Sequence, residues 1–107
     1  MPSYLVQISY TTGSMAALLK KPQNRAAAVS KSVEKLGGKI EGGWFTFGDY
    51  DVAVVLDMPD NMSAAALSMA FSAGGGCKTV KTTPMISMDD SLVAMKKAAA
   101  CGYKPAK

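Results

Sequence analysis

The sequence contains no histidine, which excludes several common kinds of catalytic site. Histidine exchanges protons near neutral pH and is the general base of serine and cysteine triads. Cysteine is scarce as well, because Cys77 and Cys101 lie far apart with no second thiol near either. Metal clusters need several ligands at short spacings, so we expect no metal site, no cofactor and two reduced thiols in ordinary packing roles.

Long apolar runs are also missing. No segment approaches the roughly 18 consecutive apolar residues that a membrane-spanning helix requires. The segment MPSYLVQISY at the start lacks the basic region, the apolar stretch and the small-residue cleavage site of a signal peptide. We therefore expect a cytoplasmic protein without a membrane partner, in agreement with its low cysteine content.

Most of the chain carries no excess charge of one sign. The formal net charge is +4, from 12 basic and 8 acidic side chains. The whole excess is supplied by the lysines near the C-terminus, Lys96, Lys97, Lys104 and Lys107. Lysines in the last turn of a helix offset the negative end of its dipole. This local role is a sufficient explanation, and we expect no nucleic-acid partner.

What the sequence does contain is a regular succession of strand and helix patterns. A period of two predicts a first strand over 4–10, and further strands are predicted over 39–47, 51–58 and 78–83. A short helical turn capped by Ser14 precedes Pro22. Spacings of three and four then predict a helix over 23–36, whose apolar stripe is Ala26, Val29, Val33 and Leu36.

Two further helices are predicted in the second half of the chain. The first is capped by Asp60 or Asn61, ends at Gly74, and buries the stripe Leu67, Ala70 and Phe71. The second follows a capping box at Ser87 and Asp90 and carries the stripe Met88, Leu92, Met95 and Ala99.

The predicted order is β-α-β-β-α-β with an added C-terminal helix. This is the ferredoxin-like sandwich of the α+β class, in which an antiparallel sheet has its first and third strands in the centre. The run Val52–Leu56 is apolar at every position, as in a central strand, whereas the polar fourth strand with Pro84 suits a sheet edge. We expect residues 1–107 to form a single domain of this kind.

The connection between the second and third strands has turn chemistry. The Gly48-Asp49 pair predicts a two-residue type II′ hairpin with a positive φ at Gly48. Turn chemistry also explains Tyr50 and Asp51 more simply than catalysis does. However, Asp51 begins an apolar strand, so its charge must be paired if it is buried, and Arg25 is one candidate partner.

The segment Phe47-Gly48-Asp49-Tyr50-Asp51 resembles the signature of the GYD domain family, which are small ferredoxin-like proteins. The segments 37–39, 44–47 and 57–60, together with Pro22 and Arg25, resemble further landmarks of that family. The resemblance covers nearly the whole chain. It implies a dimeric α/β-barrel type of assembly, but it implies no particular reaction, so the catalytic residues stay unknown.

Two functions remain open at this point. The first is a small-molecule-binding or cofactor-independent enzyme domain with a pocket between sheet and helices, whose candidate ligand-binding residues are Tyr10, Arg25, Trp44, Tyr50 and Asp51. The second is a non-catalytic assembly module whose interior its own side chains fill, and the aromatic residues fit such a core. RNA binding is not expected, because the third strand lacks stacking aromatic residues.

The strand pattern also predicts self-association. Both internal helices of this fold lie on one face of the sheet, yet the segment 52–56 is apolar toward both faces. The other face therefore needs a cover. The C-terminal helix is one cover, and a second copy of the sheet is a more complete one, so we expect a homodimer or a higher oligomer.

Overall fold

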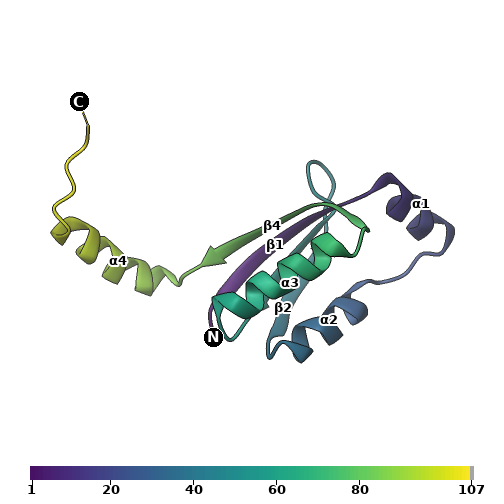
Figure 1. The fold of residues 1–107 in the computed structure, drawn as a ribbon, viewed down its shortest axis with the longest axis horizontal. Coiled ribbons are helices and arrows are strands. Elements are labelled where there is room, and N and C mark those ends of the chain that lie inside the picture. The colour runs from purple at the N-terminus through teal and green to yellow at the C-terminus, as the bar shows by residue number, and fades with distance from the viewer. Residues whose placement is uncertain (107) are drawn as a thin grey trace.

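The computed structural model describes residues 1–106 of the 107-residue chain, and these form one antiparallel sheet with four helices (Figure 1). The strands are β1 (Ser3–Tyr10), β2 (Lys39–Phe45), β3 (Val52–Asp57) and β4 (Cys77–Met85). The helices are α1 (Thr12–Lys20), α2 (Ala26–Lys35), α3 (Asn61–Ala73) and α4 (Met88–Ala100). The strand order β2-β3-β1-β4 places β1 and β3 in the centre and confirms the α+β, ferredoxin-like prediction.

Alternation along β1 decides which face of the sheet is buried. Tyr4, Val6 and Ile8 point to the same face, and each is at most 5% exposed. Helices α2 and α3 cover this face and bury Val33 and Leu67 against it. Each such side chain contributes roughly 1.5–3 kcal/mol to folding, so this face is the core of the domain.

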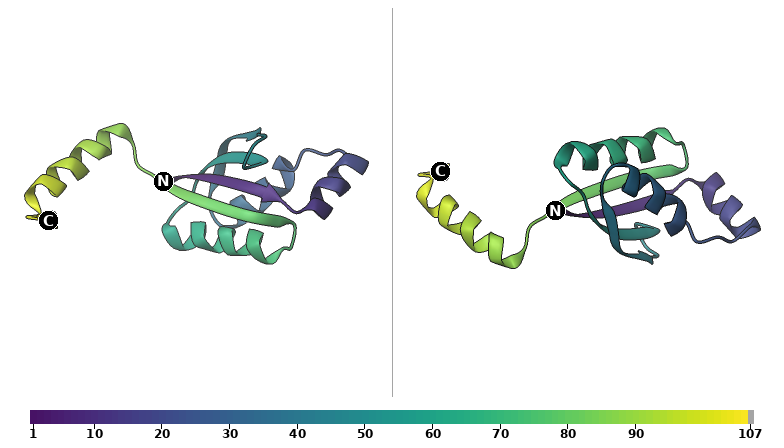
Figure 2. Two further views of the ribbon diagram at one scale, coloured as in Figure 1. Left: turned by 90° about the horizontal axis from the view of Figure 1, so that it is seen from above. Right: turned by 90° about the horizontal axis from the view of Figure 1, so that it is seen from below.

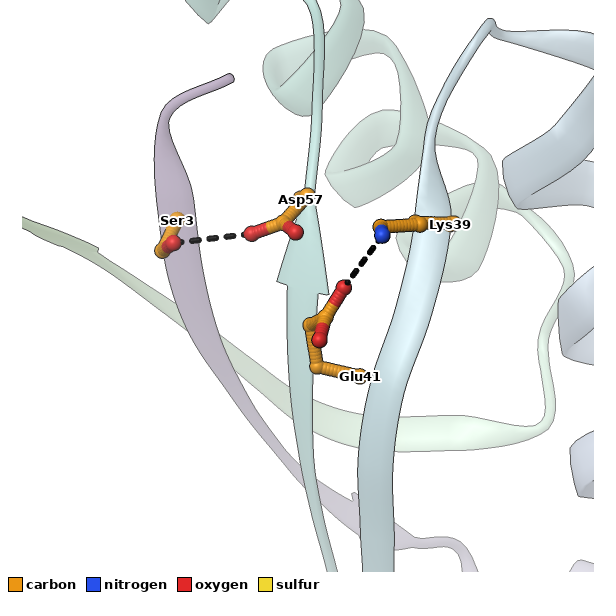
Figure 3. Close-up of polar contacts among 4 residues, drawn as sticks. All are labelled: Ser3, Lys39, Glu41 and Asp57. Carbon is orange, nitrogen blue, oxygen red and sulfur yellow. Dashed lines mark hydrogen bonds and ion pairs between the residues drawn. The ribbon is translucent and has the colours of Figure 1, made fainter.

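The other face of the sheet is covered by neither α2 nor α3, and we call it the helix-free face. By strand register it presents Ser3, Leu5 and Gln7 of β1, Ala53, Val55 and Asp57 of β3, and Trp44 of β2. At one end of it the Ser3 hydroxyl donates to Asp57 Oδ1 at 2.8 Å (Figure 3). This hydrogen bond, helped by the Lys39 ammonium, lowers the pKa of Asp57. The face is therefore apolar at its middle and polar at that end.

Helix α1 is longer than the single turn expected before Pro22. Its N-cap is Thr11, whose hydroxyl accepts from the Ser14 amide at 3.1 Å, so the prediction that Ser14 is the cap was wrong. The next helix begins at Ala26 instead of residue 23. Helix α1 itself has no buried residue.

Helix α3 begins as predicted, with Asp60 as its N-cap accepting from the Ser63 amide at 2.8 Å. This backbone hydrogen bond lowers the pKa of Asp60. The buried stripe is Ala64 and Leu67, with Phe71 half-buried. The prediction of Ala70 in this stripe was wrong, because that residue is exposed.

Helix α4 stands apart from the rest of the domain, beyond the end of β4 (Figures 1 and 2). Ser87 caps it as predicted, accepting from the Asp90 amide at 2.9 Å. Its apolar stripe is uncovered, since Met88, Leu92 and Met95 are all more than half exposed. The helix therefore does not cover the helix-free face of its own sheet. No helix within residues 1–106 has the length and apolar character needed to cross a membrane.

The connection between β2 and β3 is longer than a two-residue turn. The Thr46 amide donates to the Asp51 carbonyl at 2.7 Å, and β2 already ends at Phe45, so residues 47–50 form the loop. The type II′ assignment was therefore wrong. The positive dihedral at Gly48 is confirmed, with a φ of 135°.

Replacing Gly48 with valine should lower the free energy of unfolding by about 1–3 kcal/mol, because a β-branched residue is strained at a positive φ. The matched control is Gly13→Val in α1, where φ is not positive and an added Cβ meets no atom within 4 Å. Its effect should stay within about 0.5 kcal/mol. Urea unfolding followed by circular dichroism measures both, and equal effects would contradict the strain expected at the positive φ of Gly48.

Candidate functional site

A cavity of about 620 Å³ lies between the core face of the sheet and helices α1 and α2. Ligand cavities in proteins measure roughly 300–1,000 Å³, so this one has room for a small organic molecule. Most of the lining residues are apolar. Those from the sheet lie on β1, β2 and β3: Val6, Ile8, Ile40, Phe45, Val52, Val54 and Leu56. The helices and the connection between α1 and α2 complete the apolar lining with Met15, Leu18, Leu19, Pro22, Ala26, Val29 and Phe71.

The cavity exists because α1 does not pack closely against the sheet. Met15, Leu18 and Leu19 face the cavity, yet none of them is buried and Leu19 is 76% exposed. Pro22 lacks an amide hydrogen and cannot continue α1, so an irregular connection leads to the start of α2. The domain therefore leaves apolar surface uncovered on its core side, where a ligand can bury it.

One end of the cavity is polar. Its polar lining residues are Tyr10, Gln23, Asn24 and Arg25, three of them in the connection between α1 and α2. Asn24 Oδ1 accepts a hydrogen bond from the Ala26 amide at 2.9 Å. Gln23 Oε1 accepts one from the Arg25 guanidinium at 3.4 Å. Within residues 1–106, no carboxylate lies within 4.0 Å of the Arg25 guanidinium. The cavity thus combines apolar walls with a single cation at one end.

Tyr10 and Cys77 lie opposite each other on β1 and β4 near this polar end. Burial raises the pKa of the Tyr10 hydroxyl, and the nearby Arg25 charge partly offsets that effect. Burial likewise raises the pKa of the Cys77 thiol, again opposed by Arg25. Both groups are therefore neutral near pH 7, and the Tyr10 hydroxyl is available as a hydrogen-bond donor.

Asp51 lies just before β3, and the structure gives it a partner other than Arg25. Its Oδ2 accepts from the Tyr10 backbone amide at 2.8 Å, while its own amide donates to the Ile8 carbonyl at 2.8 Å. It does not line the cavity. Asp51 therefore lies outside the cavity and fixes the last residues of β1, including Tyr10, which lines the polar end.

The remaining sequence candidates, Tyr50 and Trp44, behave differently. Tyr50 does not line the cavity, and its carbonyl accepts from the Thr46 hydroxyl at 2.7 Å within the hairpin. Trp44 contributes to the cavity boundary, but its register partner Ala53 lies on the helix-free face, and its indole ring lies over Gly42. Phe45, one residue later, pairs with Val52 and faces the cavity.

Of the five candidate residues, the structure therefore brings Tyr10, Arg25 and Trp44 to the cavity, and leaves Tyr50 and Asp51 outside its lining. The prediction that the aromatic residues form a core holds for Tyr4 but is wrong for Trp44, Phe45 and Phe47, which are mostly exposed. Sequence reasoning missed the contribution of α1. The spacing of Met15, Leu18 and Leu19 was the available signal, since residues three and four apart share one helix face.

The polar groups of the cavity are hydrogen-bonding groups and one cation. No group of three or more potential metal-ligating side chains occurs in the part of the chain that the structure describes. The groups that can act on a bound molecule are the Arg25 guanidinium, the neutral Tyr10 hydroxyl and the amides of Gln23 and Asn24. These can orient a ligand by hydrogen bonds and by one positive charge.

Comparisons with known proteins agree with this description of the fold. The family model described as "GYD domain" matches residues 4–95. A solved structure titled "crystal structure of FFRP-DM1" is similar, with a TM-score of 0.52 and 13% identity, over 80% of this chain and 100% of that chain. At this identity the likeness concerns the fold alone. A comparison with curated proteins found no match.

Asp51→Ala should lower the free energy of unfolding by about 1–2 kcal/mol, because it leaves the half-buried Tyr10 amide without its acceptor. Asp51→Asn keeps one side-chain oxygen and should cost less. The matched control is Asp49→Ala at the exposed loop, expected within about 0.5 kcal/mol of the parent. Chemical denaturation measures all three, and equal losses for Asp51→Ala and Asp49→Ala would contradict this role.

Proposed function

The chain belongs to the GYD domain family, and from the cavity that its residues build we propose that it binds small apolar molecules and works as a homo-oligomer. The observation that carries the proposal is the cavity of about 620 Å³ between sheet and helices. An assembly module needs no such space, and its interior is normally filled by its own side chains. The cavity therefore favours a binding domain over a purely structural one.

The composition of the lining indicates the kind of ligand. Apolar side chains surround most of the cavity, and polar ones gather at the end near Arg25. Ligand sites of this type gain affinity from burial of apolar surface and orientation from a few polar contacts. Cofactor-independent chemistry on such a ligand is compatible with these residues, with Tyr10 and Arg25 as the groups that reach it.

Self-association is the second part of the proposal, and two uncovered surfaces support it. The middle of the helix-free face is apolar, where Leu5 pairs with Val55 and Ala53 lies two positions away on β3, and all three are only partly buried. The α4 stripe of Met88, Leu92 and Met95 is likewise exposed to solvent. A two-fold partner that covers both surfaces removes this apolar area from water. We further propose a cytoplasmic location, where the free thiols of Cys77 and Cys101 stay reduced.

Ala26→Trp should block the cavity, because Ala26 lines it at the start of α2. We expect the parent protein to bind the neutral fluorophore N-phenyl-1-naphthylamine, and the variant to bind it at least about tenfold more weakly, since the indole takes up the space. The matched control is Ala27→Trp, at an exposed neighbouring position outside the lining. Fluorescence titration measures the affinity of each protein for the fluorophore. The proposed site would be contradicted if the parent protein did not bind the fluorophore, or if both variants bound it equally well.

Leu92→Glu should reduce the mass of the oligomer, because it places a charge within the exposed apolar stripe of α4. Ala94→Glu is the matched control, since a 100° rotation per residue puts it on the far side of the same helix. Light scattering with size exclusion at micromolar concentration should show the parent and the control above the 11.1 kDa of one chain. A monomeric parent would contradict self-association.

A further inference from the structure

We propose that the ligand of this cavity is an apolar molecule with one carboxylate group, and that Arg25 pairs with that carboxylate. This inference rests on the proposed binding function and names the class of molecule that the site selects. It starts from the placement of Arg25, which lines the cavity in the connection between α1 and α2.

The positive charge of Arg25 has no counterpart nearby. The ion pair found within residues 1–106 joins Lys39 and Glu41, on another part of the sheet. The Arg25 guanidinium makes one neutral hydrogen bond, to Gln23 Oε1 at 3.4 Å, and no carboxylate within residues 1–106 lies within 4.0 Å of it. A guanidinium has five N–H donors in a planar fork that matches a carboxylate, so most of its donors remain available.

The surroundings of Arg25 also favour a negative group. Helix α2 begins directly after it, and the first turn of α2 contains no acidic residue to offset the positive end of the helix dipole. The hydroxyl of Tyr10 stays protonated near neutral pH, because burial raises its pKa, and it can donate a second hydrogen bond. Arg25 and Tyr10 thus present donors to the same end of the cavity.

The number of charges decides between ligand classes. Arg25 is the one cation among the lining residues, which matches a monoanion better than a dianion such as a phosphate monoester. A neutral ligand would gain no charge-assisted hydrogen bond from Arg25, whose side chain is exposed to water. A cationic ligand would add like-charge repulsion.

The test compares three ligands that share one apolar body and differ in the charge of the head group. These are 1-naphthylacetate, its neutral isostere 1-naphthylacetamide, and the cation 2-(1-naphthyl)ethylamine, each measured by displacement of bound N-phenyl-1-naphthylamine. For the parent protein we expect the acid to bind at least about tenfold more tightly than the amide, and the amine most weakly, because charge-assisted hydrogen bonds are the stronger ones.

Variants then show whether Arg25 causes the preference for the acid. Arg25→Gln should remove the preference for the acid over the amide, whereas Arg25→Lys should retain part of that preference. The matched control is Lys31→Gln, which removes one exposed charge of α2 outside the lining and should keep the full preference.

The outcomes separate this inference from the proposed function. Equal affinity for acid and amide in the parent overturns the inference and leaves apolar binding intact. The same loss of preference in Arg25→Gln and Lys31→Gln overturns it too, since net charge would then be the cause. Absence of N-phenyl-1-naphthylamine binding overturns both.

Discussion

Three hydrogen bonds of Asp51 hold together the end of the sheet on which the cavity depends. Its amide donates to the Ile8 carbonyl, its carboxylate accepts from the Tyr10 amide, and its carbonyl accepts from the Thr46 amide. They join the last residues of β1 and β2 to the start of β3. Because side chains alternate between faces, a slip of one residue would exchange the buried and exposed sets of a strand. The cavity floor therefore depends on this register.

The sequence predicted those parts of the fold that follow from local patterns. Alternation in β1 identified Tyr4, Val6 and Ile8 as one face, and helical spacing identified Val33 as buried. The cap at Asp60 and the positive φ at Gly48 also followed from residue chemistry. Each of these features depends on neighbours within a few positions, which is why the order of residues was sufficient to predict them.

The features that sequence reasoning missed depend on distant parts of the chain. The partner of Asp51 is 41 positions away, and no local rule chooses between Tyr10 and Arg25. The loop between β2 and β3 is also held by β1, because the Ser9 hydroxyl donates to the Asp49 carbonyl and the Asp51 amide donates to the Ile8 carbonyl. The cavity was expected only as one alternative, since its size depends on how far α1 stands from the sheet. Periodicity shows which face of a helix is apolar, but it does not show how closely that face packs.

The loose packing of α1 has a consequence for how the fold opens locally. A helix without buried residues loses little when it unfolds locally, so its opening costs far less than unfolding of the whole domain. Because α1 forms part of the cavity wall, such opening exposes the apolar lining to water while the core around Val33 and Leu67 stays folded. The cavity wall and the core of the sheet therefore differ in local stability.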